Sequence, residues 1–292
     1  MLVHLLPFLL FHLLCRPGLC LSLEPRSDDP HSNATIASIE ALQARLADET
    51  LSGADAASLW LQLGTLLTFK DVRYHEDGFV TRERALEAFD QALRTAPVDD
   101  RSLQLVAHHK RGMLLKMMGR GEEAVRAHEQ ALALATSDAD RSVALQFKAA
   151  ALSMMGAPSE AAALYREALS LAPSQLGIYH PLAGCLAEVG QSSGAWRALL
   201  EEVRERGRAY DAGEVGESLP EQLSFEYSTG TSSPQYHWAL FVVADKAGEP
   251  REAWRSLRRA HEIQIKKVGL PASNFLNIAD QTIESYSEGI SL

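Results

Sequence analysis

Few residues in this sequence have the types and spacing that chemistry requires. The densest polar cluster, Tyr-His-Glu-Asp at residues 74–77, places its imidazole and carboxylates next to one another in the chain and not at the spacing of one helix face, so it makes a poor metal site. His108 and His109 are also adjacent, and adjacent side chains on a helix point about 100° apart. We therefore expect these histidines to face solvent or a groove, and we predict no catalytic residue, cofactor or metal site.

Composition and motifs argue against several classes of function. The chain has 292 residues, of which 46% are hydrophobic, and a formal net charge of −10, which is typical of a folded globular protein. It contains no P-loop, Gly-x-Gly-x-x-Gly, His-Glu-x-x-His or Cys-x-x-Cys sequence. Because an acidic chain without a Lys/Arg stripe lacks the cationic surface that binds phosphate backbones, we predict no nucleic-acid partner. We also predict that the chain is not an enzyme.

Residues 1–20 predict a secretory signal peptide. The apolar run at residues 2–14 is shorter than the roughly 20 residues of a membrane span but fits the apolar core of a leader. An uncleaved anchor and a buried N-terminal helix are the alternatives. Asn33 opens an Asn-x-Thr acceptor for N-glycosylation in the polar segment that follows. We therefore expect the mature chain, glycosylated at Asn33 and without a membrane span, in the lumen of the secretory pathway or outside the cell.

An internal repeat dominates the rest of the sequence. An Ala, a large residue and usually a second Ala recur with offsets of four and three residues, so they share one helix face. A Gly precedes the first Ala by five residues in four copies, where a tight turn between helices favours positive φ. These turn glycines are Gly119, Gly156, Gly190 and Gly248. The residues predicted to pack within the repeats are Trp60, Gly64, Ala85, Phe89, Ala92, Ala124, Ala131, Ala161, Tyr165, Ala168, Ala195 and Ala253.

Together with a Trp-x-x-Leu-Gly-x-x-Leu sequence that starts at Trp60, this pattern resembles the tetratricopeptide repeat (TPR). The resemblance implies antiparallel helix pairs in which small residues let two helices cross closely. We therefore predict an all-α fold, a TPR-like right-handed superhelical solenoid, over residues 54–267. A polar segment with a short helix is expected at residues 21–53, and a capping helix or tail at residues 268–292.

Two segments exceed the repeat length. The first alanine of each copy is called its marker alanine, and these are Ala85, Ala124, Ala161, Ala195 and Ala253. Successive marker alanines are 39, 37, 34 and 58 residues apart, compared with about 34 in a regular TPR array. The excess predicts insertions near residues 71–79 and 208–234. Insertions in solenoids map to loops, and loops often carry function, so these segments are either partner-contact elements or plain surface loops.

TPR arrays commonly bind extended peptides in a concave groove lined by the first helix of each pair. By this resemblance the groove here is apolar and rich in methionine, whose flexible thioether suits varied apolar partners; the alternative is that these side chains belong to the core. We therefore predict a noncatalytic scaffold that binds a protein or peptide of unknown identity. The predicted groove residues are Leu61, Thr65, Phe69, His109, Met113, Met117, Met154, His180 and Trp238.

A second resemblance covers residues 236–290. The aromatic run from Tyr236 to Phe241 and the Ala-Trp pair ending at Trp254 are similar to the last helix pair before the catalytic domain of TPR-containing sulfotransferases. No phosphosulfate-binding loop of that family precedes Leu292, so no sulfuryl-transfer residue is implied here. The alternative function is therefore a truncated or noncatalytic repeat half of a sulfotransferase-like protein, with a catalytic domain missing from this chain.

Overall fold

The computed structural model describes residues 30–48, 50–73, 78–213, 231 and 233–268. In that part of the chain every regular element is a helix, which confirms the predicted all-α fold. The elements are α2 (Pro30–Leu46), α3 (Gly53–Arg73), α4 (Gly78–Thr95), α5 (Arg101–Met117), α6 (Gly121–Leu134), α7 (Asp138–Met154), α8 (Pro158–Leu171), the 3-10 turn η1 (Leu176–Ile178), α9 (Tyr179–Val189), α10 (Ser193–Asp211), α11 (Pro234–Ala247) and α12 (Pro250–Val268).

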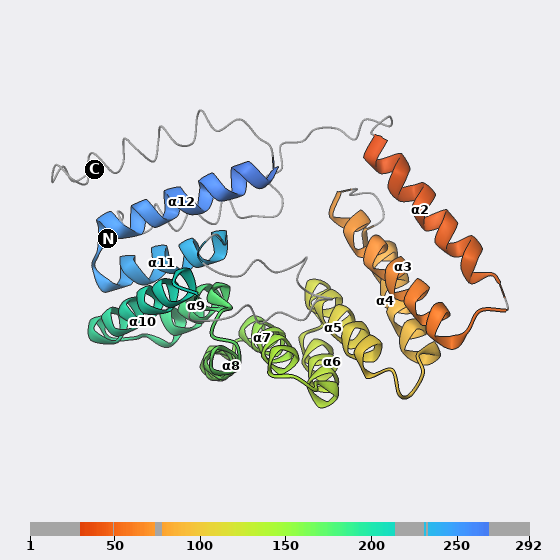
Figure 1. Ribbon diagram of the computed structural model, residues 1–292, viewed down its shortest axis with the longest axis horizontal. Helices are drawn as coiled ribbons and strands as arrows, with labels where there is room; N and C mark the ends of the chain where they lie inside the picture. The colour runs from red at the N-terminus through yellow and green to blue at the C-terminus, as the bar shows by residue number, and fades with distance from the viewer. Residues whose placement is uncertain (1–29, 49, 74–77, 214–230, 232, 269–292) are drawn as a thin grey trace.

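The helices follow one another around an arc, with α2 to α4 at one end and α11 and α12 at the other (Figure 1). Within pairs, α3 packs against α4, α5 against α6, α7 against α8 and α11 against α12. Between pairs, α4 contacts α5, α6 contacts α7, α8 contacts α9 and α10 contacts α11. The first helices of neighbouring pairs also touch, α3 with α5, α5 with α7 and α9 with α11. This is the solenoid of antiparallel helix pairs that the repeat pattern predicted.

The four predicted turn glycines all have a left-handed backbone. Gly119, Gly156, Gly190 and Gly248 have φ values of 77°, 80°, 82° and 84°, directly after α5, α7, α9 and α11. This conformation lets the chain leave one helix and enter the next within a few residues, and glycine adopts it without the steric penalty of a Cβ atom. The recurring glycines therefore set the short connection inside each pair.

The close helix crossings place an aromatic ring over a glycine. A Cβ atom on Gly64 of α3 would lie 2.7 Å from Cε1 of Phe89 on α4, which is buried. The next pair repeats the arrangement, because a Cβ atom on Gly112 would lie 2.5 Å from Cε1 of His128. Tyr165 occupies the corresponding buried position on α8. The missing side chain on one helix thus makes the room that the ring on its partner fills.

Two repeat-related ion pairs connect consecutive units. Arg111 Nε of α5 donates to Asp90 Oδ1 of α4 at 2.6 Å. Lys148 Nζ of α7 donates to Glu129 Oε1 of α6 at 2.8 Å. The two acids are 39 residues apart and the two cations 37 residues apart, which are spacings of the marker alanines. Both pairs link the second helix of one unit to the first helix of the next.

The N-terminal helix α2 packs against α3 through buried Ile39 and Leu42. Asn33 lies in its first turn. α3 continues to Arg73 and α4 begins at Gly78, so helices take up most of the first predicted insertion. No described helix has the length and hydropathy that crossing a bilayer requires. The predicted leader and C-terminal tail, the cluster at residues 74–77 and most of the second insertion lie outside the described residues.

Candidate functional site

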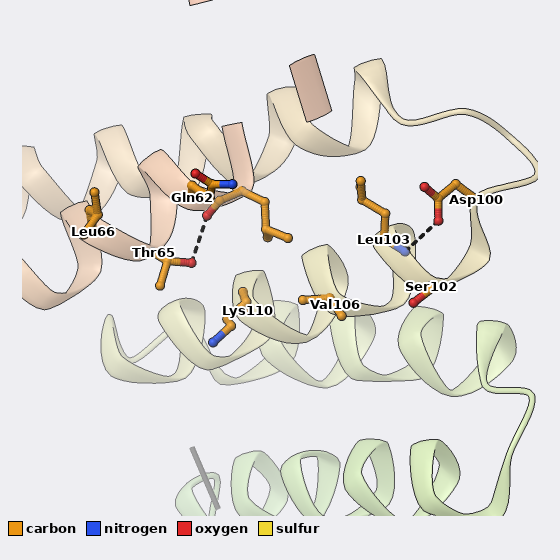
Figure 2. A pocket seen from close by; sticks show the side chains of 9 residues that line it. Gln62, Thr65, Leu66, Asp100, Ser102, Leu103, Val106 and Lys110 are labelled. Atoms are coloured by element: carbon orange, nitrogen blue, oxygen red, sulfur yellow. Dashed lines mark hydrogen bonds between the residues drawn. The ribbon is translucent and has the colours of Figure 1, made fainter. Parts of the chain in front are cut away.

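A pocket of about 620 Å³ lies between α3 and α5. Figure 2 shows α3 along one side and α5 along the other, with the connection into α5 at one end. Its walls therefore come from the first helices of two neighbouring pairs. The residues that line it are Leu61, Gln62, Thr65, Leu66, Asp100, Ser102, Leu103, Val106 and Lys110.

The α3 wall is one helix face. Leu61, Gln62, Thr65 and Leu66 recur at the spacing that places residues on adjacent turns of the same side. The Thr65 Oγ1 hydroxyl donates to the Leu61 backbone oxygen at 2.8 Å. Because this bond satisfies the hydroxyl within its own helix, the threonine presents mainly its methyl group and the wall stays largely apolar.

The α5 wall starts at a helix cap. Asp100 is the N-cap residue, and its carboxylate accepts a hydrogen bond from the Leu103 backbone N–H at 3.0 Å. Gln104 Nε2 donates to the Pro97 backbone oxygen at 2.7 Å, which ties the preceding connection to the helix. Leu103, Val106 and Lys110 then follow at offsets of three and four residues along the wall. The cap thereby fixes where this face begins.

Charge is distributed unevenly along the pocket. Lys110 is the one cationic side chain among the lining residues, and burial lowers its pKa to about 8 because an ammonium group loses hydration there. Asp100 lies at the opposite end (Figure 2). The two residues are ten positions apart, which is about 15 Å along a helix. Between them the pocket is walled mainly by leucine and valine.

This arrangement suits binding. It combines apolar contact area with one cation at one end, which would hold an apolar group and orient a charged one. Elsewhere in the described part of the chain, no three His, Cys, Asp or Glu side chains gather where they could hold a metal ion.

A family model described as the tetratricopeptide repeat matches residues 103–174, which span α5 to α8. This part of the chain carries tetratricopeptide repeats. The match includes Arg111 and Lys148, the cations of the two inter-unit ion pairs, and the pocket-lining residues Leu103, Val106 and Lys110. No curated protein sequence matches the chain. The family match bears on the repeats alone, so the resemblance of residues 236–290 to sulfotransferases stays a prediction.

Several solved structures are similar to this chain at low sequence identity. BtubC from P. vanneervenii has a TM-score of 0.54 and 14% identity, over 83% of this chain and 92% of BtubC. YrrB, described as a TPR protein with an unusual peptide-binding site, has a TM-score of 0.43 and 16% identity, over 84% of this chain and 99% of YrrB. PilF from Pseudomonas aeruginosa has a TM-score of 0.46 and 15% identity, over 88% of this chain and 100% of PilF. At 14% identity, the likeness to BtubC concerns the fold and not the ligand.

The structure places two of the predicted groove residues in the pocket of the TPR array. Leu61 and Thr65 are part of its α3 wall. Met113 and Met117 lie on the same face of α5 as the pocket-lining Lys110, at offsets of three and seven residues, and Met117 is 41% exposed. Neither methionine is among the residues that line the pocket.

His109 is not a groove residue, and this prediction is wrong. Its side chain is 1% exposed and packs edge-on against Phe147 of α7, with 4.2 Å between ring centroids. His128 of α6 lies 5.6 Å from His109, centroid to centroid, and is fully buried. Among the described residues neither nitrogen of His128 has a hydrogen-bond partner. The array therefore holds two imidazoles inside its core.

Burial sets the protonation of these two histidines. It lowers the pKa of His128 to about 3, because the imidazolium would lose its hydration and would also lie near the charge of Lys116. Burial likewise holds the pKa of His109 well below its usual value, with His128, Lys110 and Lys116 adding repulsion. Both rings are therefore neutral at physiological pH.

The other predicted groove residues are distributed along the array. His180 of α9 and Trp238 of α11 come together with 5.8 Å between ring centroids, and burial lowers the pKa of His180. Met154 is 47% exposed at the end of α7 and lies close to Gly121 at the start of α6. The Phe69 side chain lies outside the described residues. These positions do not join the pocket between α3 and α5.

The predicted repeat-packing residues are buried with one clear exception, Ala195. That residue is exposed, and Trp196 beside it is buried, so the prediction for Ala195 is wrong. On α10 the buried residues are Trp196, Leu199, Leu200, Val203 and Gly207. Trp60 is half-buried against the core. The buried residues of the predicted set are Gly64, Ala85, Phe89, Ala92, Ala124, Ala131, Ala161, Tyr165, Ala168 and Ala253.

The chain also contains one motif with the spacing of a catalytic site, which the predictions from sequence did not include. Residues 190–194 read Gly-Gln-Ser-Ser-Gly, which matches the Gly-x-Ser-x-Gly spacing of a hydrolase nucleophile. That motif acts at the turn between a strand and a helix. Here it joins α9 to α10, and Ser192 is the N-cap of α10, with its Oγ accepting from the Ala195 N–H at 3.3 Å. In the TPR array this serine is a helix cap.

Proposed function

We propose that this chain is a noncatalytic scaffold that binds an extended segment of a partner protein in the pocket between α3 and α5. The observation that carries the proposal is the pocket itself, an apolar hollow of about 620 Å³ between the first helices of neighbouring TPR pairs. Protein interaction is the activity that a TPR fold supports. A pocket of this size accommodates one or two bulky side chains.

The dimensions of the pocket favour a peptide segment. The α5 wall runs from Asp100 to Lys110, a distance of about 15 Å along the helix. An extended chain covers that length in four to five residues at about 3.3 Å each. Leu103 and Val106 on one side and Leu61 and Leu66 on the other would contact alternate side chains of such a segment.

Thr65→Arg is expected to reduce binding at least about tenfold, or 1.4 kcal/mol. The long cationic side chain would fill the pocket and would add a second charge near Lys110. The measurement is selection of peptides from an mRNA-displayed library of random twelve-residue sequences on the immobilised full-length chain, followed by fluorescence anisotropy of the recovered peptides.

Thr95→Arg on α4 is the matched control. Thr95 makes the same local hydrogen bond as Thr65, from Oγ1 to the backbone oxygen four residues earlier, at 2.8 Å. It does not line the pocket. Circular dichroism checks that both variants fold. Recovery of the same peptides with equal affinity by Thr65→Arg would overturn the proposed site.

The proposed place of action is the lumen of the secretory pathway or the extracellular space. Support comes from the apolar run at residues 2–14 and from the Asn-x-Thr acceptor at Asn33. We expect the intact mass of the endogenous protein to lack residues 1–20 and to fall when N-glycans are removed enzymatically. A mass that includes the leader and does not change on glycan removal would contradict this placement.

A further inference from the structure

We infer that proton uptake by the α5–α6 pair and binding of a segment in the pocket between α3 and α5 exclude one another, so that acid makes the array release its partner. The inference rests on the proposed function, because it assigns a regulation to that same pocket. Its structural basis is that α5 lines the pocket on one side and packs against the buried ring of His128 on the other.

α5 is shared by the pocket and by the core of the array. Leu103, Val106 and Lys110 line the pocket. His109 is the residue next to Lys110, and about 100° of rotation around the helix turns its ring into the core, where it is 1% exposed. α5 contacts α3 and α4 as well as α6 and α7. A movement that separates α5 from α6 therefore also displaces one wall of the pocket.

His128 of α6 lies where the closed array cannot accommodate a second proton. Its ring is fully buried, and neither ring nitrogen has a hydrogen-bond partner among the described residues. The ring covers Gly112 of α5, where a Cβ atom would lie 2.6 Å from Nε2 and 2.9 Å from Nδ1. An imidazolium would have to direct two N–H donors into this contact without water to receive them. The ring must therefore reach water to be protonated, which requires that α6 separate from α5.

The charges around His128 act in the same direction. On α5 the groups that face it are His109, with 5.6 Å between ring centroids, and Lys116, whose charge lowers the pKa of His128. From α7 the facing group is the uncharged ring of Phe147, with 5.7 Å between centroids. The charges of Lys110 and Lys116 likewise lower the pKa of His109. None of these facing groups is a carboxylate, so a proton on either imidazole would meet repulsion.

The response to acid should be concentrated in the α5–α6 pair. Burial lowers the pKa of His128 to about 3, compared with about 6.5 for an imidazole in water. At pH 5, protonation of the exposed ring should therefore raise the equilibrium constant for opening this pair about thirtyfold over its value at pH 7.5. The helices of the neighbouring pairs α3–α4 and α7–α8 contain no histidine. Because each pair of a solenoid contacts mainly its neighbours, one pair can open while others stay folded.

Occupancy of the pocket should oppose this opening. A segment that contacts Leu103 and Val106 on α5 together with Leu61 and Leu66 on α3 binds the closed form, because the open form lacks one wall. By mass action, a ligand at about a hundred times its dissociation constant lowers the opening constant about a hundredfold. Reciprocally, the apparent affinity for the ligand falls when acid makes the open form abundant.

The first test measures amide hydrogen exchange of the full-length chain at pH 7.5 and 5, with each rate divided by the intrinsic rate at that pH. In the wild type the opening constant of the α5 and α6 amides is expected to rise at least about thirtyfold, and that of the α8 amides less than about threefold. His128→Phe should reduce the rise in α5 and α6 about thirtyfold. His261→Phe is the matched control, because it removes a partly buried histidine from α12 and should leave the response of α5 and α6 unchanged.

The second test uses peptides that the wild type recovers from the random twelve-residue library at pH 7.5. A peptide at about a hundred times its dissociation constant should lower the opening constant of α5 and α6 at pH 5 about a hundredfold. Its affinity, measured by fluorescence anisotropy, should fall at least about fivefold from pH 7.5 to 4.5 in the wild type and less than about twofold in His128→Phe.

The possible outcomes separate this inference from the proposed function. An equal rise in the opening of α5 and α6 in wild type and His128→Phe, or an affinity that falls equally in both, would overturn the inference and leave the scaffold function standing. A peptide that binds without protecting α5 and α6 would overturn the inference and place the binding site outside the pocket. Recovery of no peptide above the level of the Thr65→Arg variant would overturn the proposed function and the release of a partner with it, whatever the exchange rates.

Discussion

Replacing Phe89 with Ala is expected to lower the free energy of unfolding by about 3–5 kcal/mol. The ring is 1% exposed and belongs to a core cluster with Leu63, Leu67 and Leu86. It also fills the space over Gly64, where no side chain from α3 can replace it. The cavity would therefore collapse only partly, and the variant loses both the apolar burial and the contacts of the ring. Urea denaturation followed by far-ultraviolet circular dichroism measures the difference.

A double-mutant cycle with Gly64→Ala tests the cause of that loss. In the native chain the added Cβ would lie 2.7 Å from Cε1 of Phe89, so overpacking should cost about 1–3 kcal/mol. The higher helix propensity of Ala offsets up to about 1 kcal/mol of this. In the Phe89→Ala background the clash is absent, so Gly64→Ala should become stabilising.

Gly184→Ala on α9 is the reference for helix propensity alone. A Cβ atom there would meet no atom within 4 Å, so this variant should gain about 1 kcal/mol. If Gly64→Ala changes stability by the same amount in both Phe89 backgrounds, the glycine and the ring do not interact. That result would contradict the close crossing on which the packing of each pair depends.

The repeat fold could be predicted because its signals are local and recur. A small residue on the first helix, a large one on the second and a glycine between them appear in successive units. Gly64 with Phe89 and Gly119 with its positive φ are examples that the structure reproduces. Each signal constrains a contact between residues that are near in the chain, so the fold follows from a few spacings.

The pocket could be predicted only in part, because a helix face must be placed to within one residue. Counting back from Met117 at offsets of four and three residues gives Met113, Lys110, Val106 and Leu103. The prediction used His109 in place of Lys110, and a shift of one residue rotates a side chain by about 100°. His109 therefore points into the core and Lys110 lines the pocket.

The fourth unit shows what the repeat pattern cannot specify. Ala195 matches the pattern, yet the buried residue beside it is Trp196. A large aromatic side chain gains more from burial than a methyl group, so tertiary packing, and not the repeat pattern, decides which of the two neighbouring side chains is buried. The ion pairs Asp90–Arg111 and Glu129–Lys148 each join helices of two different units. A residue pattern within one helix does not reveal which residues of another helix it contacts.

Lowering the pH from 7.5 to 5 is expected to destabilise the array by at least about 2 kcal/mol through His128 alone. The pKa of His128 is lowered to about 3 in the folded chain, compared with about 6.5 in an unfolded one. The unfolded state therefore binds more protons between these values, and stability falls as the pH drops through that window. At pH 5 the difference of about 1.5 pH units from the unfolded pKa corresponds to about 2 kcal/mol.

His109 adds to the effect in the same direction, because burial also holds its pKa well below the usual value. The partly buried histidines at positions 108, 180, 237 and 261 have pKa values lowered by burial as well. Urea denaturation at a series of pH values measures the slope. A stability that stays constant from pH 7.5 to 5 would contradict the buried neutral imidazoles.

Two substitutions of His128 separate the effect of its protonation on stability from the effect of burying its polar nitrogens. His128→Phe restores the aromatic type found at the corresponding Phe89 and Tyr165, and it removes two nitrogens that have no partner among the described residues. It should raise stability at neutral pH by about 1–3 kcal/mol and reduce the loss at pH 5 by about 2 kcal/mol.

His128→Gln removes the titration but leaves an amide without partners in the core, so it should reduce the pH dependence without the gain at neutral pH. If both variants keep the slope of the wild type, the acid sensitivity arises from other groups. If only His128→Phe stabilises the chain and both variants lose slope, the fold keeps the imidazole of His128 neutral in the core. The acid sensitivity of the array then follows from its two nitrogens, which have no hydrogen-bond partner among the described residues.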